Sequence, residues 1–498
     1  MSQMSQTKSR FGTSQELLKA SNFFAFPEKP ADLISLFMRA GLLVCLVSSI
    51  ILALYSAFFT RSQWFVPPDL NRTSRDVSVG ESGPTNISHI LFGIGASVKT
   101  LPKRRPYMEQ WWVPNATRGY LWLDEEPKEE KQKTGPIPYR VSEDWTRFRY
   151  LSSQSAVRIA RIVLESFKLG LPNVRWFVMG DDDSVFFTDN LVSVLATYDH
   201  NQMYYIGGNS ESVEQDVLHS YDMAFGGGGI AVSYPLAAKL VNIIDGCLDR
   251  YYRFYGSDQR IWACINEIGV PLTQQDGFHQ LDIRGDPYGL LAAHPLAPLV
   301  SLHHLDQFEP IFPNQTQMDS FKSLMKAYRV DPSRILQQCF CYDRKRKWSI
   351  SISWGYTLQI YPSMVPVLEL QRPFQTFKTW RSWSNGPFTF NTRPMSSNPC
   401  QRPVIYFLDR VEETSTKSGS LSIYKRFVAK DGKQCNREDY GRVMTVQRII
   451  VSSIKMDPAN WKKAPHRKCC EIMDRGSIKN GDMRIRIRNC RAKETITV

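Results

Sequence analysis

Three consecutive carboxylates, Asp181, Asp182 and Asp183, are the residues of this sequence whose spacing is best suited to chemistry. They directly follow residues 174–179, a nearly continuous run of β-branched and aromatic side chains that predicts a strand buried on both faces. In α/β proteins ligands collect beyond the carboxyl ends of such strands. Adjacent anions repel one another unless a cation lies among them, and hard divalent cations prefer carboxylate oxygens. The triplet therefore predicts a metal-dependent ligand site, with a charged turn as the alternative.

A run of four glycines at 226–229 indicates a second part of the same site. No side chain extends beyond Cα there, so another backbone or a ligand must approach closely. The run is not a nucleotide-binding P-loop, because no Gly-Lys-Ser/Thr sequence follows it.

One further carboxylate and two histidines are candidates for the chemistry. Ser257 is the expected N-cap of a helix, which places Asp258 in the first turn, where the helix dipole favours a negative charge. A simple capping role is the alternative for Asp258. His279 and His303 could complete an oxygen-rich metal site, although a lone histidine is often a structural residue.

The segments around the triplet predict alternating strands and helices. We expect strands at 90–94, 120–123 and 204–206, and a charged loop at 124–138. Residues 152–169 predict a helix whose polar residues recur every three or four positions, opposite an apolar side that packs on the sheet. This order of elements is typical of an α/β fold.

The C-terminal part differs in charge from the rest of the chain. Residues 339–498 contain 30 Lys and Arg against 13 Asp and Glu, whereas residues 1–338 contain 32 against 35. The part that carries the triplet is therefore not basic, which argues against nucleic-acid binding. The basic part is either a solvated surface or a contact for acidic glycan or anionic lipid.

The same C-terminal region predicts strands. Apolar residues alternate with Ser, Thr and Gln over 348–360, which predicts one amphipathic strand of thirteen residues. Residues 483–488 alternate in the same way, and 404–408 and 447–454 are further candidates. We therefore expect a β-rich accessory region at 313–498 behind the α/β domain.

Cysteine usage indicates an oxidising compartment. Nine of the ten cysteines follow residue 59, and their spacing matches no common zinc ribbon, so disulfides are expected rather than a metal. Because nine is odd, one thiol stays free or pairs between chains, which would give a homodimer.

Residues 40–59 form an uncharged apolar stretch of twenty residues. At about 1.5 Å per residue, a helix of this length spans the roughly 30 Å hydrocarbon layer. We therefore expect a cytosolic tail (1–39), a transmembrane signal-anchor (40–59), a stem (60–88) and a lumenal body, with a buried core helix as the alternative. Four glycosylation sequons all follow the stretch, at Asn71, Asn86, Asn115 and Asn314.

Together these motifs resemble the fringe-like glycosyltransferases of glycosyltransferase family 31. The resemblance is carried by the acidic triplet, the glycine run, the Ser257-Asp258 helix start, the turn at 269–272 and the Phe278-His279 pair. The segments 285–306, 354–362 and 387–394 look like the plant branch of fringe-related proteins classed under a domain of unknown function. The resemblance covers about residues 88–470.

The resemblance implies a type II Golgi membrane protein with a GT-A fold at 89–312. It also implies inverting transfer of a hexose or N-acetylhexosamine from a UDP-sugar to a glycan or glycoprotein hydroxyl, with Mn²⁺ or Mg²⁺ as cofactor. A non-catalytic glycan-binding or scaffolding relative is the alternative. By position, the resemblance gives roles to Asp183 (metal), Asp181, Asp182, Gly227 and Gly228 (donor), Asp258 (base), His279 (the better-matched metal histidine) and His303 (its alternative). Fringe enzymes begin the helix at Asp258 with two acids, whereas Ser257 stands first here.

Overall fold

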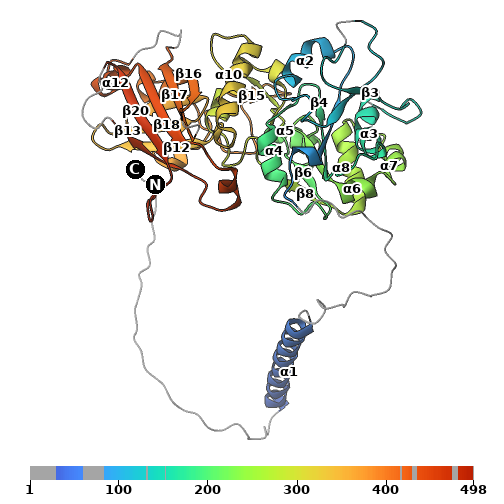
Figure 1. The fold of residues 1–498 in the computed structure, drawn as a ribbon. Coiled ribbons are helices and arrows are strands. Elements are labelled where there is room, and N and C mark those ends of the chain that lie inside the picture. The colour runs from blue at the N-terminus through green and yellow to red at the C-terminus, as the bar shows by residue number, and fades with distance from the viewer. Residues whose placement is uncertain are drawn as a thin grey trace, which may run out of the picture. The chain divides into compact units, whose positions relative to one another are not determined.

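The computed structural model describes residues 30–59, 83–129, 133–151, 153–415, 418–428, 435–473 and 480–496. The chain divides into two compact units, 1–79 and 80–498. Helix α1 (Pro30–Phe59) is the described element of the first unit (Figure 1). Within these described ranges no helix is long and apolar enough to cross a membrane, so the signal-anchor expected at 40–59 is not supported. Most of the expected tail and stem, with Asn71, lies outside the described residues.

A seven-stranded sheet forms the first part of the second unit, in the order β3-β2-β1-β4-β7-β6-β8. Strands β1 and β4 are parallel, and their register pairs Gly95 with Asp181. Both strands therefore end at the same edge of the sheet, where the triplet begins. The expected strands at 90–94, 120–123 and 204–206 are present. The bounds are β1 (Ile90–Gly95), β2 (Gly119–Leu123), β3 (Tyr139–Val141), β4 (Trp176–Asp181), β6 (Tyr205–Gly207), β7 (Ile230–Ser233) and β8 (Leu272–Gln274).

Alternate residues of these strands enter two separate hydrophobic cores. Leu91 and Phe177 pack in the core formed with α3, α6, α7 and α8, whereas Phe92 and Val178 pack in the core on the opposite face. Figure 1 shows α3, α6, α7 and α8 grouped together. The helices are α2 (Leu101–Met108), α3 (Gln154–Lys168), α4 (Thr188–Leu195), α5 (Val213–Leu218), α6 (Tyr234–Leu240), α7 (Ile244–Arg250) and α8 (Ser257–Ile268).

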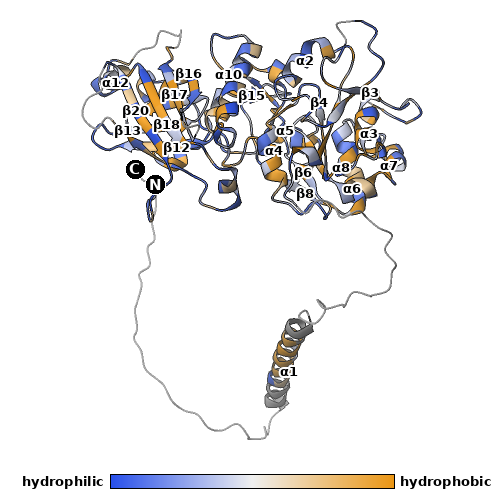
Figure 2. Cartoon of the chain, in the orientation of Figure 1, coloured by the Kyte–Doolittle hydropathy of each residue, from blue (hydrophilic) through white to orange (hydrophobic). Residues whose placement is uncertain are grey.

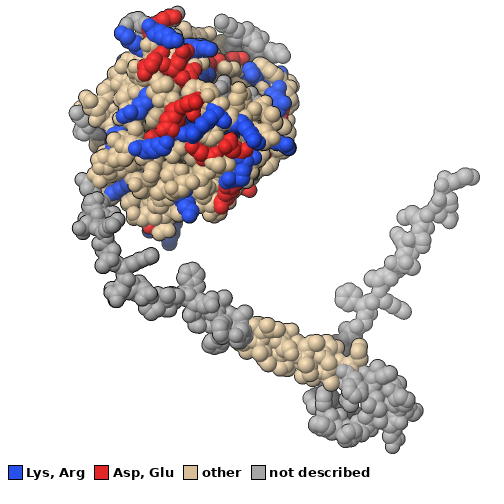
Figure 3. Space-filling view, turned by 90° about the vertical axis from the view of Figure 1, so that its right-hand side faces the viewer, with Lys and Arg blue, Asp and Glu red and all other residues tan. Residues whose placement is uncertain are grey.

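Three of the four polar residues on the polar side of α3, Arg158, Arg161 and Glu165, are buried. Arg161 Nη2 lies 2.7 Å from the Glu143 carboxylate, and its Nη1 lies 3.1 Å from that of Asp245 on α7. Arg158 Nη1 donates to the Trp122 carbonyl at 2.7 Å. Because α7, α8 and the segment that follows β3 cover this side, its charges are paired there. Figure 3 shows basic and acidic side chains intermingled on the surface at the right-hand side of Figure 1.

Glu165 of α3 gives a testable pH dependence. Burial raises the pKa of Glu165 to about 7. The folded protein therefore holds this proton more tightly than the unfolded chain, so the Glu165 contribution to stability falls as pH rises from about 4.5 to 7. Glu165→Gln is expected to raise the free energy of unfolding at pH 8, by up to about 2–3 kcal/mol, and to change it little at pH 5. Urea denaturation at both pH values measures this.

Glu143, which follows β3 and pairs with Arg161 and Lys168 of α3, provides the control. Hydrogen bonds from Lys168 and Arg161 lower the pKa of Glu143. Glu143→Gln should therefore leave stability unchanged or reduce it at pH 8, which is the opposite sign. If both variants shift stability in the same direction at pH 8, burial of the Glu165 carboxylate is not the cause.

The C-terminal region forms a closed barrel in the order β12-β13-β14-β16-β17-β18-β20-β19. Apolar residues line its strands, as Figure 2 shows for β18 and β20. The expected β-rich region is therefore present, and the alternation at 483–488 buries Met483, Ile485 and Ile487. The strands are β12 (Gln338–Asp343), β13 (Trp348–Ser353), β14 (Thr357–Tyr361), β16 (Val404–Glu413), β17 (Gly419–Arg426), β18 (Arg448–Ile454), β19 (Cys469–Ile472) and β20 (Asp482–Arg488).

The single strand expected at 348–360 is wrong, because the segment is a hairpin. Strands β13 and β14 pair antiparallel, and the chain turns at Gly355, which has φ of 81°. Glycine adopts such a left-handed conformation without strain. The alternation continues through the turn, which is why periodicity alone did not reveal the break.

Shorter elements connect the sheet with the barrel, and one hydrophobic core is continuous between them. Phe312, for example, makes a T-shaped contact with Tyr356 of the barrel, with ring centroids 5.3 Å apart. A domain boundary at 312/313 remains a prediction. The shorter elements are β5 (Val185–Phe186), β9 (Phe278–His279), β10 (Ile283–Gly285), α9 (Tyr288–Ala292), β11 (Ser301–Leu302), α10 (Gln317–Val330), α11 (Val367–Leu370) and β15 (Phe377–Thr379), and α12 (Glu438–Met444) lies between the barrel strands β17 and β18.

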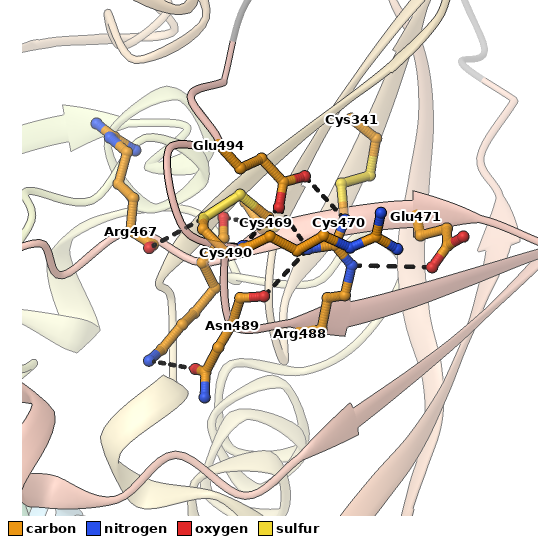
Figure 4. The surroundings of a disulfide bond; sticks show 12 residues. Cys341, Arg467, Cys469, Cys470, Glu471, Arg488, Asn489, Cys490 and Glu494 are labelled. Carbon is orange, nitrogen blue, oxygen red and sulfur yellow. Dashed lines mark hydrogen bonds and ion pairs between the residues drawn. A yellow bond between two sulfur atoms is a disulfide. The ribbon is translucent and has the colours of Figure 1, made fainter.

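Eight cysteines form four disulfides, as expected, and not a zinc site. The pairs are Cys247–Cys264, Cys341–Cys470, Cys400–Cys435 and Cys469–Cys490. The adjacent residues Cys469 and Cys470 bond to different partners at one end of the barrel (Figure 4). The cysteine left over beyond residue 59 is Cys339, whose thiol is buried and donates to the Lys468 carbonyl at 3.3 Å. Burial of Cys339 gives no support to a disulfide-linked homodimer.

The three sequon asparagines within the described residues, Asn86, Asn115 and Asn314, are exposed. Asn115 and Asn314 have positive φ, which is typical of turns. Their exposure is compatible with glycosylation.

Candidate functional site

The acidic triplet meets a histidine at the end of β4. One ligand atom each from Asp181, Asp183 and His303 lies within 4.8 Å of the others. His303 Nε2 is 3.1 Å from Asp183 Oδ1 and 3.9 Å from Asp181 Oδ2. His303 directly follows β11, which pairs with β9 and β5. Two carboxylates and an imidazole are thus held together by two different sheets.

Charge within this cluster is balanced by neighbouring cations. Burial alone would raise the pKa of Asp183, but His303 and Arg104 hold it well below its usual value. Burial would lower the pKa of His303, but Asp183 and Asp181 raise it to about 8. Removal from water, together with the neighbouring carboxylates, raises the pKa of Asp181 to about 7. The cluster therefore attracts positive charge.

Asp182 faces a different set of partners from Asp181. Its carboxylate accepts hydrogen bonds from Arg104 Nη1 and from the Thr100 hydroxyl. Arg104 Nη2 also lies 2.9 Å from Asp183 Oδ2. Arg104 and Thr100 come from α2 and its N-terminus, which follow β1. Sequence reasoning missed both, because nothing in the basic run at 103–105 distinguishes Arg104 from its neighbours.

The glycine run passes directly over His303. A Cβ on Gly227 would lie 2.1 Å from His303 Cε1, so only glycine fits there. The Ser184 hydroxyl donates to the Gly227 carbonyl at 2.6 Å, and the Gly228 N–H donates to Gln280 Oε1 at 2.7 Å. The close approach expected for these glycines is therefore that of the His303 ring and neighbouring backbone.

Asp258 lies on the other side of the glycine run. Its Oδ2 accepts from the Gly226 N–H at 3.2 Å, and its Oδ1 accepts from the Gln259 N–H at 2.9 Å. Asp258 is close enough to Asp181 to raise that group's pKa. Helix α8 begins at Ser257, so its N-cap is Gly256 and not Ser257 as expected. The base candidate and the acidic cluster therefore flank one short loop.

The structure does not place His279 in the cluster. His279 Nδ1 is 3.1 Å from Glu211 Oε1, and its Nε2 is 2.9 Å from His294 Nε2. Of the two candidate histidines, His303 lies beside the carboxylates. His304, which sequence reasoning did not single out, lies against His303 with ring centroids 3.7 Å apart and stacks on Trp380 at 4.3 Å.

The donor set of the cluster fits a divalent cation. Carboxylate oxygens suit Mg²⁺ and Mn²⁺, and an imidazole suits the softer of these ions. Among the residues that the structure describes, three chain ligands converge, so a bound cation would need further oxygen ligands, such as those of a phosphate. Asp258 offers a carboxylate on the far side of the loop. The arrangement can therefore bind an anionic ligand through a metal and accept a proton close by.

Comparisons with known proteins agree with these observations only in part. A family profile described as "Protein of unknown function, DUF604" matches residues 215–470, slightly more than half of the chain. No curated protein sequence matches.

Two solved structures share limited similarity with the chain. One is a glycosyltransferase involved in the glycosylation of the major capsid of the virus PBCV-1, with 12% identity and a TM-score of 0.26, covering 47% of this chain and 98% of its own. The other is the catalytic domain of Drosophila β1,4-galactosyltransferase 7 in complex with xylobiose, with 15% identity and a TM-score of 0.22, covering 37% and 64%. At such low TM-scores neither likeness carries an argument.

Proposed function

The chain belongs to the DUF604 family, whose function is unknown, and from the geometry of its acidic site we propose that it is a glycosyltransferase. It transfers a hexose or N-acetylhexosamine from a UDP-sugar to a hydroxyl of a glycan or glycoprotein, with inversion. Its α/β part is a GT-A domain related to the fringe enzymes. The supporting observation is the convergence of Asp181, Asp183 and His303 beside a glycine loop that also contacts Asp258.

Asp181, Asp183 and His303 would hold Mn²⁺ or Mg²⁺. A bound divalent cation supplies charge neutralisation for a departing diphosphate. Arg104 and Thr100 fix Asp182 at the base of the cluster, so that the neighbouring ligands keep their orientation. A metal would bind neutral His303 in place of the Nε2 proton that faces Asp183 Oδ1 at 3.1 Å, while Nδ1, which lies 3.2 Å from the Gln280 carbonyl, would keep its proton.

Asp258 is the proposed general base. An acceptor hydroxyl is a weak nucleophile, so a carboxylate must take its proton as it attacks the sugar carbon. The Gly226 N–H and the helix N-terminus orient the Asp258 side chain. One carboxylate in this role inverts the anomeric centre, whereas retention through a covalent intermediate would need a second.

We place the reaction in the lumen of the Golgi. Four disulfides favour an oxidising compartment, and the exposed sequons are compatible with glycosylation there. Immunolocalisation with a Golgi marker, together with a mobility shift after glycosidase treatment, tests this placement. Finding the protein in the cytosol, without N-glycans, would contradict this placement.

Thermal unfolding tests the donor site most simply. A ligand that binds the folded state stabilises it by RT ln(1 + [L]/Kd), about 2.7 kcal/mol at one hundred times Kd. UDP should raise the melting temperature with Mn²⁺ present and have little effect with EDTA. If millimolar UDP with Mn²⁺ does not shift the melting temperature, this result would count against a nucleotide site.

Gly227 provides a specific test of the cluster geometry. Gly227→Ala introduces a Cβ within 2.1–2.5 Å of the His303 ring, so the ring must shift from its position beside Asp183 or the loop must move. We expect Mn²⁺-dependent UDP binding to weaken by about 10- to 100-fold, as for groups that orient metal ligands. Isothermal titration measures this loss.

Gly226→Ala is the matched control for this prediction. A Cβ on Gly226 would have its nearest contact at 3.6 Å, with Asp258 Cβ, an ordinary separation. This variant should bind UDP and Mn²⁺ like the wild type. Equal weakening in both variants would show that loop disturbance, and not displacement of His303, is responsible.

A further inference from the structure

A second group of buried polar residues, Glu211, His279 and His294, lies on the wall of a cavity of about 670 Å³. The cavity extends from the loop after β6 to Gln338 of β12, between the sheet and the barrel. The proposed transfer reaction makes no use of these three side chains.

Four short contacts connect the group. Glu211 Oε2 accepts from the Leu281 N–H at 2.7 Å, and Glu211 Oε1 lies 3.1 Å from His279 Nδ1. His279 Nε2 lies 2.9 Å from His294 Nε2. His294 Nδ1 lies 2.8 Å from the Pro295 carbonyl oxygen.

The positions of the protons in this series of contacts can be assigned from its two ends, Glu211 and the Pro295 carbonyl. A carbonyl oxygen cannot donate, so His294 Nδ1 must carry a proton, and neutral His294 then has a lone pair on Nε2. A Glu211 carboxylate likewise requires a proton on His279 Nδ1, and neutral His279 then also has a lone pair on Nε2. Two lone pairs face each other at 2.9 Å. With the Glu211 carboxylate ionised, either an extra proton or a metal ion lies between them.

We propose that His279 and His294 bind a divalent transition-metal ion of the Zn²⁺ or Cu²⁺ class through their Nε2 atoms. Metal-binding histidines usually donate the other ring N–H to a carboxylate or a backbone carbonyl. Glu211 and Pro295 supply one acceptor of each kind. Metal–nitrogen bonds of about 2.0–2.1 Å can span the Nε2 separation. The cavity leaves room for water or a small ligand to complete the coordination.

The surroundings of the two rings fit a metal ion. Both Nδ1 atoms already face acceptors, Glu211 Oε1 and the Pro295 carbonyl oxygen, and the adjoining cavity leaves room for the further ligands that a metal ion, but not a proton, requires. Two imidazoles without a carboxylate ligand suit Zn²⁺ and Cu²⁺ better than Mg²⁺ or Mn²⁺. The site is separate from the acidic cluster, because the intervening residue Gln280 directs its carbonyl to His303 and its side chain to Gly228.

Copper binding to the full chain tests the proposal. Asp183→Asn is introduced first to disable the acidic cluster, and the protein is purified without a histidine tag and titrated with Cu²⁺. We expect about one tightly bound ion whose electron paramagnetic resonance spectrum shows coupling to two imidazole nitrogens. Adding His294→Gln should weaken binding by at least about 100-fold, and Glu211→Gln by about 10- to 100-fold. His466→Gln, a histidine outside this group, is the control and should bind like its parent.

Two results would overturn the proposal. One is the absence of a two-nitrogen signal in the Asp183→Asn protein. A proton, and not a metal ion, would then lie between the histidines. The other is tight binding that survives both His294→Gln and His279→Gln. Thermal melting without metal establishes that each variant is folded. If the His294 variant does not fold, the nitrogen coupling measured in the Asp183→Asn protein still decides whether the two histidines bind the ion.

Discussion

Asp183→Asn is expected to reduce Mn²⁺-dependent turnover of the UDP-sugar by about 10³-fold. Asp183 contacts both His303 and Arg104 and is the most strongly acidic member of the cluster. The variant removes a charged metal ligand, and a metal at a departing diphosphate contributes several kcal/mol, with each 1.36 kcal/mol worth a factor of ten. A coupled assay of UDP release measures this loss of turnover.

The same variant should also lose the Mn²⁺-dependent stabilisation by UDP. Asp249→Asn, an exposed carboxylate on α7, is the matched control and should retain both activity and stabilisation. If Asp183→Asn binds UDP and Mn²⁺ as tightly as the wild type, the metal is held elsewhere.

Asp258→Asn should give the opposite pattern, with binding kept and chemistry lost. The amide is nearly isosteric, and its oxygen can still accept from the Gly226 N–H while the hydrogen bond from the Gln259 N–H is lost, so we expect the loop and the cluster to stay in place. It cannot take a proton from an acceptor hydroxyl. General-base catalysis typically contributes 10² to 10⁴-fold, and we expect a loss of about this size in kcat.

Glu267→Gln, near the opposite end of α8, controls for changes in the helix itself. It should leave kcat unchanged. A wild type that binds glycan without transferring sugar, and an Asp258→Asn variant with the same biological activity, would instead favour a non-catalytic glycan-binding or scaffolding protein.

Much of the fold follows from local patterns in the sequence. The apolar run before the triplet predicted a buried strand, and β4 is that strand, although it starts at Trp176 and ends at Asp181, two residues beyond the apolar run. The alternation at 483–488 became β20 because one face of that strand must enter a core. The break at Gly355 escaped prediction because inward and outward residues keep the same order through the hairpin.

The site was harder to predict where it depends on contacts between distant segments. Arg104 reaches the triplet across 78 positions of the sequence, and no local pattern encodes such a contact. Strands β9 and β11 pair His279 with Leu302, so His303 lies one residue beyond that pair, and the two histidines face different surroundings. Only this register explains why His303, and not the better-matched His279, lies beside Asp181 and Asp183.

The most direct measurement is UDP release from a panel of UDP-sugars by the purified protein, with Mn²⁺ and with EDTA. The account predicts that at least one UDP-sugar is cleaved only with Mn²⁺, that adding Mn²⁺ back after EDTA restores cleavage, and that Asp183→Asn abolishes it. A folded protein that cleaves no UDP-sugar and binds no UDP at millimolar concentration with Mn²⁺ would contradict it.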